Sequence, residues 1–344
     1  MRIIAISALL LALAVPAAAA PAPVAHVKNT NGWIESIAMD GARLAYAVRG
    51  DNGSCTKVFV WNVKTRSAAV VSGRNTCGAD STSTGGGVTT IAVAGTRIAW
   101  IVNEGGNTES SDYLYTSSLP GWKERRVASV LRTGNVDGTL TGSWLGGLVG
   151  GGDRIALNQF TTDASGTVAT AALRRLDVGL ATIAAGKATL GAMSLDQHRI
   201  AVLRADQKVA LYDTDSGHLL LTVSPSSARE VALRQDYIVV LTRTRTIEIF
   251  NARTGVPVRT LPVAPGASKL DVHSGTAAYA VGRTVHILRL ADGRDAVLAT
   301  APRAIQGLEI EAPGVAYAYN TVKGIKDVGN LAFVPMSKAT SLLS

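Results

Sequence analysis

The residues of this chain that could do chemistry are few and scattered. The sequence contains no G-x-x-x-x-G-K-[ST] phosphate loop, no G-x-S-x-G nucleophile elbow and no H-E-x-x-H zinc helix. The stretch from Asp213 to Gly217 begins like a calcium loop, but the third acidic position and the closing glutamate are missing, so we interpret it as a turn. The five histidines are far apart in sequence, and we expect a structural role for each: His26, His198, His218, His273 and His286. The sequence therefore assigns no catalytic residue, no metal ligand and no cofactor.

The first residues have the pattern of an export signal. Met1 and Arg2 precede an apolar run from Ile3 to Val15, which ends at a proline and several alanines. A charged start, a short apolar core and a small-residue end are typical of a secretory signal peptide. The run is shorter than the roughly 20 residues that a membrane-spanning helix needs. We predict a signal peptide over residues 1–19, cleavage after Ala19, no membrane span, and a secreted or periplasmic protein.

Export also bears on the two cysteines, Cys55 and Cys77. An even number of cysteines outside the cytoplasm usually forms disulfides, and a metal site would need more ligands than this chain offers. We predict a disulfide between them.

Composition excludes several classes of protein. The chain is 17% charged and 47% hydrophobic, which is unlike an intrinsically disordered chain, and two cysteines cannot build a disulfide-dense small domain. The net charge is +9, but the basic residues are spread along the chain and aromatic residues make up only 5%. A nucleic-acid interface would concentrate basic charge on one face. We therefore expect no nucleic-acid partner, and leave open a weak attraction to anionic polymers of the cell envelope.

A short pattern recurs along the chain at intervals of about 40 residues, which indicates a repeat architecture. It reads apolar-x-apolar, three turn-like residues, often Arg, then apolar, Ala and a large apolar residue. The copies are Ile37–Tyr46, Ile91–Trp100, Leu148–Leu157, Met193–Val202, Val231–Val240, Leu270–Tyr279 and Leu308–Tyr317. Alternation at period two on both sides of a tight turn predicts a β-hairpin in each copy.

A second hairpin follows the first in each unit, most clearly at Lys208–Val223 and Thr246–Leu261. Four strands in about 40 residues is the pattern of a propeller blade. We predict an all-β protein, a seven-bladed β-propeller of four-stranded antiparallel blades. It forms a single domain over residues 20–344, with repeats that start near residues 34, 88, 145, 190, 228, 267 and 305.

These repeats resemble those of known propeller families. The D-G-x-R-apolar-A-Tyr stretch from Asp40 to Tyr46 resembles the first hairpin of TolB-type propellers. The second hairpins, with Tyr212-Asp213 to Gly217 and Phe250-Asn251 to Gly255, resemble those of WD40-like, YVTN-type and PQQ-dehydrogenase-like bacterial propellers. The resemblance implies a propeller scaffold over the whole mature chain.

Two repeated positions have a structural explanation. A small residue at one position lets neighbouring sheets pack closely, and it is Ala in Ala45, Ala99, Ala156, Ala201, Ala278 and Ala316. An arginine at another position indicates a repeated contact at the exit of the turn rather than an anion site, and it occurs as Arg43, Arg97, Arg154 and Arg199.

The longer connections point to one face of the ring. If the strands of a blade are named A to D from the axis outward, the long segments all fall between strands B and C or between D and the next A. We predict loops at residues 49–56, 73–89, 103–112, 132–147, 161–167 and 320–329, over blades 7, 1, 2 and 3. Loops on a rigid scaffold often carry function. We therefore place a ligand-binding surface there, with these candidate residues: Asp51, Asn52, Asp80, Glu104, Asn107, Asp137, Trp144, Lys323 and Lys326.

Two functional hypotheses follow. The first is an exported, monomeric, non-catalytic scaffold that binds a protein or a cell-envelope glycan through the long-loop face. The second is a hydrolase or lactonase-like enzyme with a metal in the central channel. Three or four Asp, Glu, Asn or His side chains converging at the channel mouth would favour the enzyme. Ring closure has two alternatives, a last strand at residues 338–343 or an N-terminal strand at residues 24–29, and we favour the second.

Overall fold

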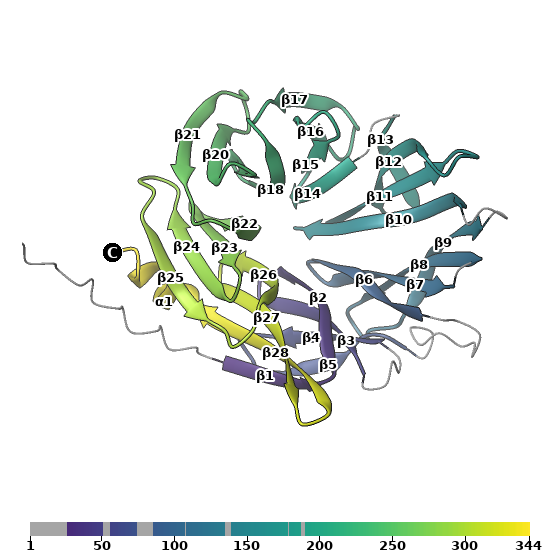
Figure 1. Cartoon of the computed structure of the whole chain (residues 1–344), viewed down its shortest axis with the longest axis horizontal. Helices are drawn as coiled ribbons and strands as arrows, with labels where there is room; N and C mark the ends of the chain where they lie inside the picture. Colours follow the sequence, from purple (N-terminus) through teal and green to yellow (C-terminus); the bar gives the residue numbers. More distant parts are fainter. Residues whose placement is uncertain are drawn as a thin grey trace, which may run out of the picture.

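The computed structural model describes residues 26–50, 56–73, 85–106, 108–134, 139–177, 179–186 and 190–344. Within these ranges the chain forms 28 strands and one short helix. The strands form sheets arranged in a ring, with the first strand of each set nearest the centre (Figure 1). Every pair of neighbouring strands is antiparallel. The predicted all-β fold of four-stranded antiparallel sheets is confirmed.

Five of the sheets described contain four strands and one contains eight. Dividing the eight-stranded sheet between β9 and β10 gives seven sets of four strands, which we call blades 1 to 7. Because β9 and β10 hydrogen-bond these two sets into one sheet, the count of seven separate blades stays a prediction.

Blades 1 to 3 begin with β2, β6 and β10. Blade 1 contains β2 (Trp33–Asp40), β3 (Arg43–Arg49), β4 (Thr56–Asn62) and β5 (Ala68–Val70). Blade 2 contains β6 (Gly85–Ala94), β7 (Arg97–Gly105), β8 (Glu109–Ser118) and β9 (Arg125–Gly134). Blade 3 contains β10 (Leu140–Gly151), β11 (Arg154–Thr162), β12 (Val168–Leu176) and β13 (Leu180–Gly186).

Blades 4 to 6 have shorter strands of five to seven residues. Blade 4 contains β14 (Leu190–Asp196), β15 (Arg199–Arg204), β16 (Val209–Asp213) and β17 (Leu219–Val223). Blade 5 contains β18 (Ala228–Arg234), β19 (Tyr237–Thr242), β20 (Thr246–Asn251) and β21 (Pro257–Pro262). Blade 6 contains β22 (Ala267–His273), β23 (Thr276–Val281), β24 (Thr284–Arg289) and β25 (Asp295–Thr300).

Blade 7 joins the two ends of the described chain. It contains β26 (Ile305–Glu311), β27 (Gly314–Lys323), β28 (Lys326–Pro335) and, as its outermost strand, β1 (His26–Asn31). Pairing of β1 with β28 places the N-terminal strand where the second alternative expects it. The first alternative is wrong, because residues 336–341 form helix α1 (Met336–Ser341). This helix is too short to cross a membrane, and no other helix is described.

The core lies between neighbouring blades. The repeated alanine is fully buried at all six positions, from Ala45 to Ala316, so that adjacent sheets approach without a large side chain between them. Large residues that follow it, such as Tyr46, Trp100 and Tyr279, are buried against the neighbouring blade. Low aromatic content therefore follows from the packing of many small interfaces.

The repeated arginines make a contact at the exit of the turn, as predicted, and the contact is with the next blade. The guanidinium of Arg43 donates to the Gly95 carbonyl (2.8 Å), and that of Arg97 donates to the Asp153 carbonyl (2.6 Å). Arg199 donates in the same way to the Gln235 carbonyl. Arg154 departs from the pattern and pairs with Asp153 and Asp215. The structural interpretation of this position is confirmed for three of its four members.

Several segments predicted as loops are extended hairpins instead. Most of residues 132–147 is strand, because β9 runs to Gly134 and pairs with the start of β10, Leu140 to Gly142. Residues 320–329 are the end of the β27–β28 hairpin rather than a loop, with only two residues between the strands. Between β7 and β8 the strands leave only residues 106–108 as a connection. These stretches contain Gly, Thr and Ser, which are frequent in loops, but backbone pairing with a neighbouring strand decides their structure.

Candidate functional site

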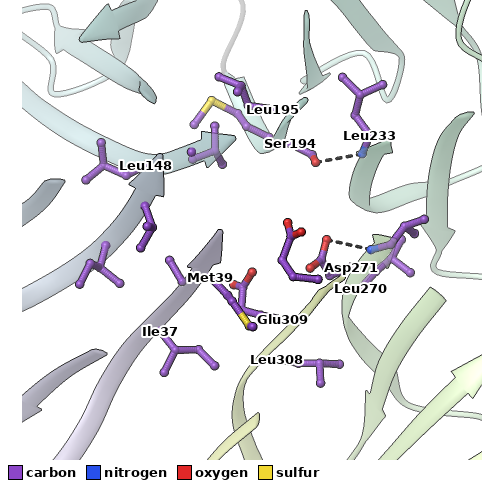
Figure 2. Close-up of a pocket in the computed structure, with 18 of the residues that line it drawn as sticks. Ile37, Met39, Leu148, Ser194, Leu195, Leu233, Leu270, Asp271, Leu308 and Glu309 are labelled. Carbon is purple, nitrogen blue, oxygen red and sulfur yellow. Dashed lines mark hydrogen bonds between the residues drawn. The ribbon is translucent and has the colours of Figure 1, made fainter. Parts of the chain in front are cut away.

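Two places gather polar side chains from several blades: the central channel, and the face on which strands B–C and D–A connect, which we call the long-loop face. The channel holds a cavity of about 220 Å³ between the first strands of all seven blades. Asp271 and Glu309 point from β22 and β26 towards its centre (Figure 2). Apolar side chains such as Leu148 and Leu308 surround them (Figure 2).

An ionic cluster lies at the channel end that is opposite the long-loop face. It is built from the last residues of inner strands, Asp196, Arg234, His273 and Glu311. The Arg234 guanidinium pairs with Glu311 and lies 3.5 Å from Asp196 Oδ1. His273 Nδ1 lies 3.4 Å from Glu311 Oε2. The side chains of Asp196, Arg234 and Glu311 are largely buried, so this is an ion-pair network removed from most solvent.

The channel carboxylates also satisfy the edges of the inner strands. Among the described strands, the inner strands other than β10 have no strand on their channel side, and β10 pairs with β9 only at its start, so many N–H groups there need other acceptors. Side chains of the preceding blade accept bonds from the inner strands and from the turns that follow them. The Gly95 N–H donates to Asp40 Oδ2 (2.5 Å) and the Gln235 N–H to Asp196 Oδ2 (2.6 Å), linking blade 1 to 2 and blade 4 to 5.

Two further bonds of this kind are visible around the cavity. The Leu233 N–H donates to Ser194 Oγ (2.9 Å), and the Ile310 N–H donates to Asp271 Oδ2 (2.8 Å) (Figure 2). The acids in the channel therefore already have partners within the protein.

Burial shifts the protonation of these acids. Burial raises the pKa of Asp271 to about 6, and it raises the pKa of Glu309 well above its usual range, with the neighbouring Asp271 and Glu311 adding to the second shift. Burial also raises the pKa of Asp40. Within the described part of the chain, no group of three or more His, Cys, Asp and Glu side chains is placed to hold a metal ion.

Sequence reasoning did not find this cluster. His273, for which the sequence predicts a structural role, lies beside Glu311 and Arg234 (Nδ1 to Arg234 Nη2 3.3 Å) at the channel end, and the sequence did not show that these residues meet. A signal was present, because the last residue of the inner strand is polar or charged in five of the seven repeats: Asp40, Asp196, Arg234, His273 and Glu311.

The long-loop face contains a larger depression, a groove of about 530 Å³ between blades 1 and 2. One side is formed by Glu35 and Arg49, which approach to 3.9 Å. Gly86 and Gly87 lie in the groove without side chains, and Leu140 closes it towards blade 3. The remaining lining residues are Val88, Thr89, Asn103, Gly105, Gly106 and Ser110.

A polar and aromatic network supports this groove from below. Asp112 is buried, and its two oxygens accept from Asn103 Nδ2 (2.6 Å) and from the Leu145 N–H (2.8 Å). Asn103 Nδ2 also lies 3.0 Å from Ser110 Oγ, which accepts from Arg132 Nη2 (3.2 Å). Two blades are thus held together under the groove.

Trp144 extends this network to the surface of blade 3. The Arg132 guanidinium lies 5.4 Å from the centre of the Trp144 ring, and Trp144 stacks on Phe160 with ring centres 5.0 Å apart. Cation–π and stacking contacts fix the position of an indole that is still partly exposed.

Contacts between blades connect the groove to the β27–β28 hairpin. The Ile34 N–H donates to Asn320 Oδ1 (2.9 Å), and Asn320 Nδ2 donates back to the Ile34 carbonyl (3.0 Å). The next residue, Glu35, accepts from the Val88 N–H (3.1 Å). Blades 7, 1 and 2 are therefore joined side by side on this face.

Among the candidate residues from the sequence, four are described. Glu104 is half-buried on β7 opposite Gly86 beside the groove, and Trp144 lies on the network below it. Lys323 and Lys326 lie at the tip of the β27–β28 hairpin, at the other end of the face. Seven predicted site and disulfide residues lie outside the described residues: Asp51, Asn52, Cys55, Cys77, Asp80, Asn107 and Asp137. The sequence missed Asn103, Ser110, Asp112 and Arg132, whose interactions depend on strand pairing.

Comparison with known proteins supports the fold. No protein-family model matches the chain, and no curated protein matches its sequence. Among solved structures, a chain from the crystal structure of the mitotic checkpoint complex is similar, with a TM-score of 0.58, 12% identity, and coverage of 97% of this chain and 99% of that one. The WD40 β-propeller domain of Doa1 is similar with a TM-score of 0.57, 13% identity, and coverage of 92% and 97%. At this identity the likeness concerns the fold alone, and it supports a β-propeller fold similar to that of WD40 domains.

Proposed function

We propose that this protein is a non-catalytic binding scaffold whose long-loop face holds an extended segment of a protein partner in the groove between blades 1 and 2. The observation that carries the proposal is the groove itself, with its glycine floor and its network of fixed polar and aromatic side chains. The WD40-like fold agrees with it, since such propellers typically serve as protein-interaction scaffolds.

The glycine floor favours a peptide chain as the occupant. β6 is the inner edge of its sheet, and Gly86 and Gly87 present backbone there without side chains. A partner backbone can approach such an edge closely and exchange main-chain hydrogen bonds with it. Beside the floor, the Arg49 guanidinium is 47% exposed and would supply a donor, while Glu35 already accepts from Thr56 and the Val88 N–H and holds the edge of the groove in place.

Trp144 is the best candidate for an anchor. Partly exposed tryptophan and arginine side chains dominate the binding energy of many interfaces, particularly when their neighbours hold them in place. Phe160 and Arg132 position the indole before a partner arrives, which reduces the entropy lost on binding.

The proposal includes the features predicted from the sequence that lie outside the described residues. We take the protein to be exported after cleavage behind Ala19, with a Cys55–Cys77 disulfide and seven blades. The disulfide would join the two connections that flank β4 and β5 on the long-loop face.

A channel enzyme is the alternative. Its support is that Asp40, Asp196, His273 and Glu311 gather at one channel end, which is the pattern named above as favouring an enzyme. The groove is better supported, because its volume of about 530 Å³ exceeds the 220 Å³ of the channel cavity, and because Arg234 already pairs with two of the four channel residues. A substrate or metal in the channel would have to compete with these internal partners.

Photo-crosslinking tests the proposal. A photoreactive amino acid is placed at Leu140 in the groove and, as a matched control, at Val258, an exposed apolar residue on the outer strand of blade 5. In extracts of the source cells we expect a protein adduct from position 140 that is absent from position 258. Trp144→Ala should reduce the adduct about tenfold, whereas Asp271→Asn should leave it unchanged.

Three outcomes would contradict the proposal. Glycan adducts at position 140 would make the partner class wrong. Equal adducts at positions 140 and 258 would show non-specific contact. Loss of the adduct in Asp271→Asn, with Trp144→Ala unaffected, would move the site to the channel.

A further inference from the structure

The tip of the β27–β28 hairpin is unusually apolar and basic for a turn. The two strands are joined by Gly324 and Ile325, and Gly324 has φ 64° while Ile325 has no positive φ, as in a type II′ turn. Turns of this kind normally carry polar residues at the second position. Here Ile325 is 100% exposed, and Val322 beside it is 58% exposed.

Lysines flank this tip on both strands. Lys323 and Lys326 are direct cross-strand partners, both are exposed, and neither forms an ion pair with any residue that the structure describes. Like charges placed directly opposite each other destabilise a hairpin. The arrangement costs stability within the protein, and an external anion would relieve this cost.

Aromatic and basic residues continue the pattern at the base of the hairpin. Trp33, which is 46% exposed, precedes the Ile34–Asn320 hydrogen bonds that attach the hairpin to blade 1. Arg49, 47% exposed, is the strand partner of Trp33. Asn320 lies five residues before Ile325, a length of about 17 Å along a strand.

We propose that this hairpin inserts its tip into the surface of an anionic lipid bilayer. Ile325 and Val322 would enter between the headgroups while the ammonium groups of Lys323 and Lys326 stay at the level of the phosphates, as lysines at an interface do. Trp33 would meet the outer part of the headgroup layer, a position that tryptophan favours. The hairpin projects from the ring, which lets the tip reach a flat surface (Figure 1). This inference is independent of the groove and its partner.

Vesicle co-sedimentation tests this proposal. The full mature chain is mixed with vesicles of phosphatidylcholine alone or of equal parts phosphatidylcholine and phosphatidylglycerol. We expect binding to the anionic vesicles that weakens as salt is added. Ile325→Ser, which suits the same turn, should weaken it about tenfold, and Lys323→Gln with Lys326→Gln should weaken it further.

The control variants remove the same number of charges, or a similar apolar side chain, from other parts of the surface. Lys64→Gln with Lys123→Gln removes two exposed lysines from turns on the opposite face, and Val258→Ser removes an exposed apolar side chain from blade 5. Both should bind like the wild type. Ile325→Trp should show a blue-shifted fluorescence with anionic vesicles. Absence of binding, equal binding to neutral vesicles, or equal losses in the control variants would overturn the proposal.

Discussion

The central channel and the long-loop face use polar residues in opposite ways. In the channel, Asp40, Asp196 and Asp271 accept hydrogen bonds from the next blade, and Arg234 joins two acids. On the long-loop face, the buried Asp112 supports side chains that remain partly exposed, among them Trp144 and Arg132. The comparison teaches that a convergence of acids in a propeller channel can be a device for joining blades rather than a catalytic centre.

The largest effect is expected from Arg234. Arg234→Met would remove the arginine that pairs with the buried Glu311 and would leave Asp196 with Arg199 alone, and breaking a buried ion pair in this way costs about 3–5 kcal/mol. Urea unfolding should therefore show a strongly lowered midpoint. Adding Glu311→Gln to this variant should restore part of the loss. A change below about 1 kcal/mol would mean that the cluster does not hold the blades together.

A smaller effect is expected from the protonation of Asp271. Because burial holds its pKa at about 6 in the folded state, above its ordinary value of 3.8, the folded protein binds this proton more tightly than the unfolded chain. Its contribution to stability is present below about pH 4 and is lost as the pH rises through about 6. Asp271→Asn should flatten the fall in unfolding free energy across this range.

The exposed Asp292 provides a control, because its pKa is shifted in the opposite direction to that of Asp271. The Arg289 guanidinium lowers the pKa of Asp292 to about 2, so its contribution is present above about pH 4 and is lost as the pH falls through about 2. Asp292→Asn should leave the slope between pH 4 and 7 unchanged. If Asp271→Asn also leaves that slope unchanged, Asp271 is solvated and does not act as a buried link.

The smallest effect is expected from an exposed ion pair. Arg253 Nε lies 2.8 Å from Asp236 Oδ1, yet the two side chains are 76% and 52% exposed. Such pairs contribute at most about 1 kcal/mol, because water and salt screen them. Arg253→Met should shift the urea midpoint only slightly. A loss as large as that of Arg234→Met would show that burial does not decide how much an ion pair contributes in this protein.

The repeated architecture could be predicted because each blade has the same sequence pattern. Alanines such as Ala45 and Ala99, and tight turns such as the one at Asp40-Gly41, occur at the same place in successive units. The pattern can therefore be recognised even where a single copy departs from it. The N-terminal strand was also within reach, because blade 7 lacked a fourth strand. The extended hairpins could not be predicted, because the glycine and threonine residues around Leu140 are typical of loops, and only pairing with β9 makes this segment a strand.

The sites could be predicted only in outline. Trp144 and Glu104 were predicted in loops but lie on strands β10 and β7, and the side chains that organise the groove, such as Asp112 and Arg132, depend on pairings between strands of two blades. Arg234 and Glu311 are 77 residues apart in sequence and meet only because the ring brings inner strands together. The spacing of these residues in the sequence does not show which inner strands become neighbours when the ring closes.

The central claim is that the long-loop face, and not the channel, binds the partner. It is tested most directly by the Kd of the protein recovered from the Leu140 crosslink, measured for the wild type, Trp144→Ala and Asp271→Asn. The account predicts that Trp144→Ala raises the Kd about tenfold or more and that Asp271→Asn leaves it unchanged. A Kd raised by Asp271→Asn and unchanged by Trp144→Ala would contradict it.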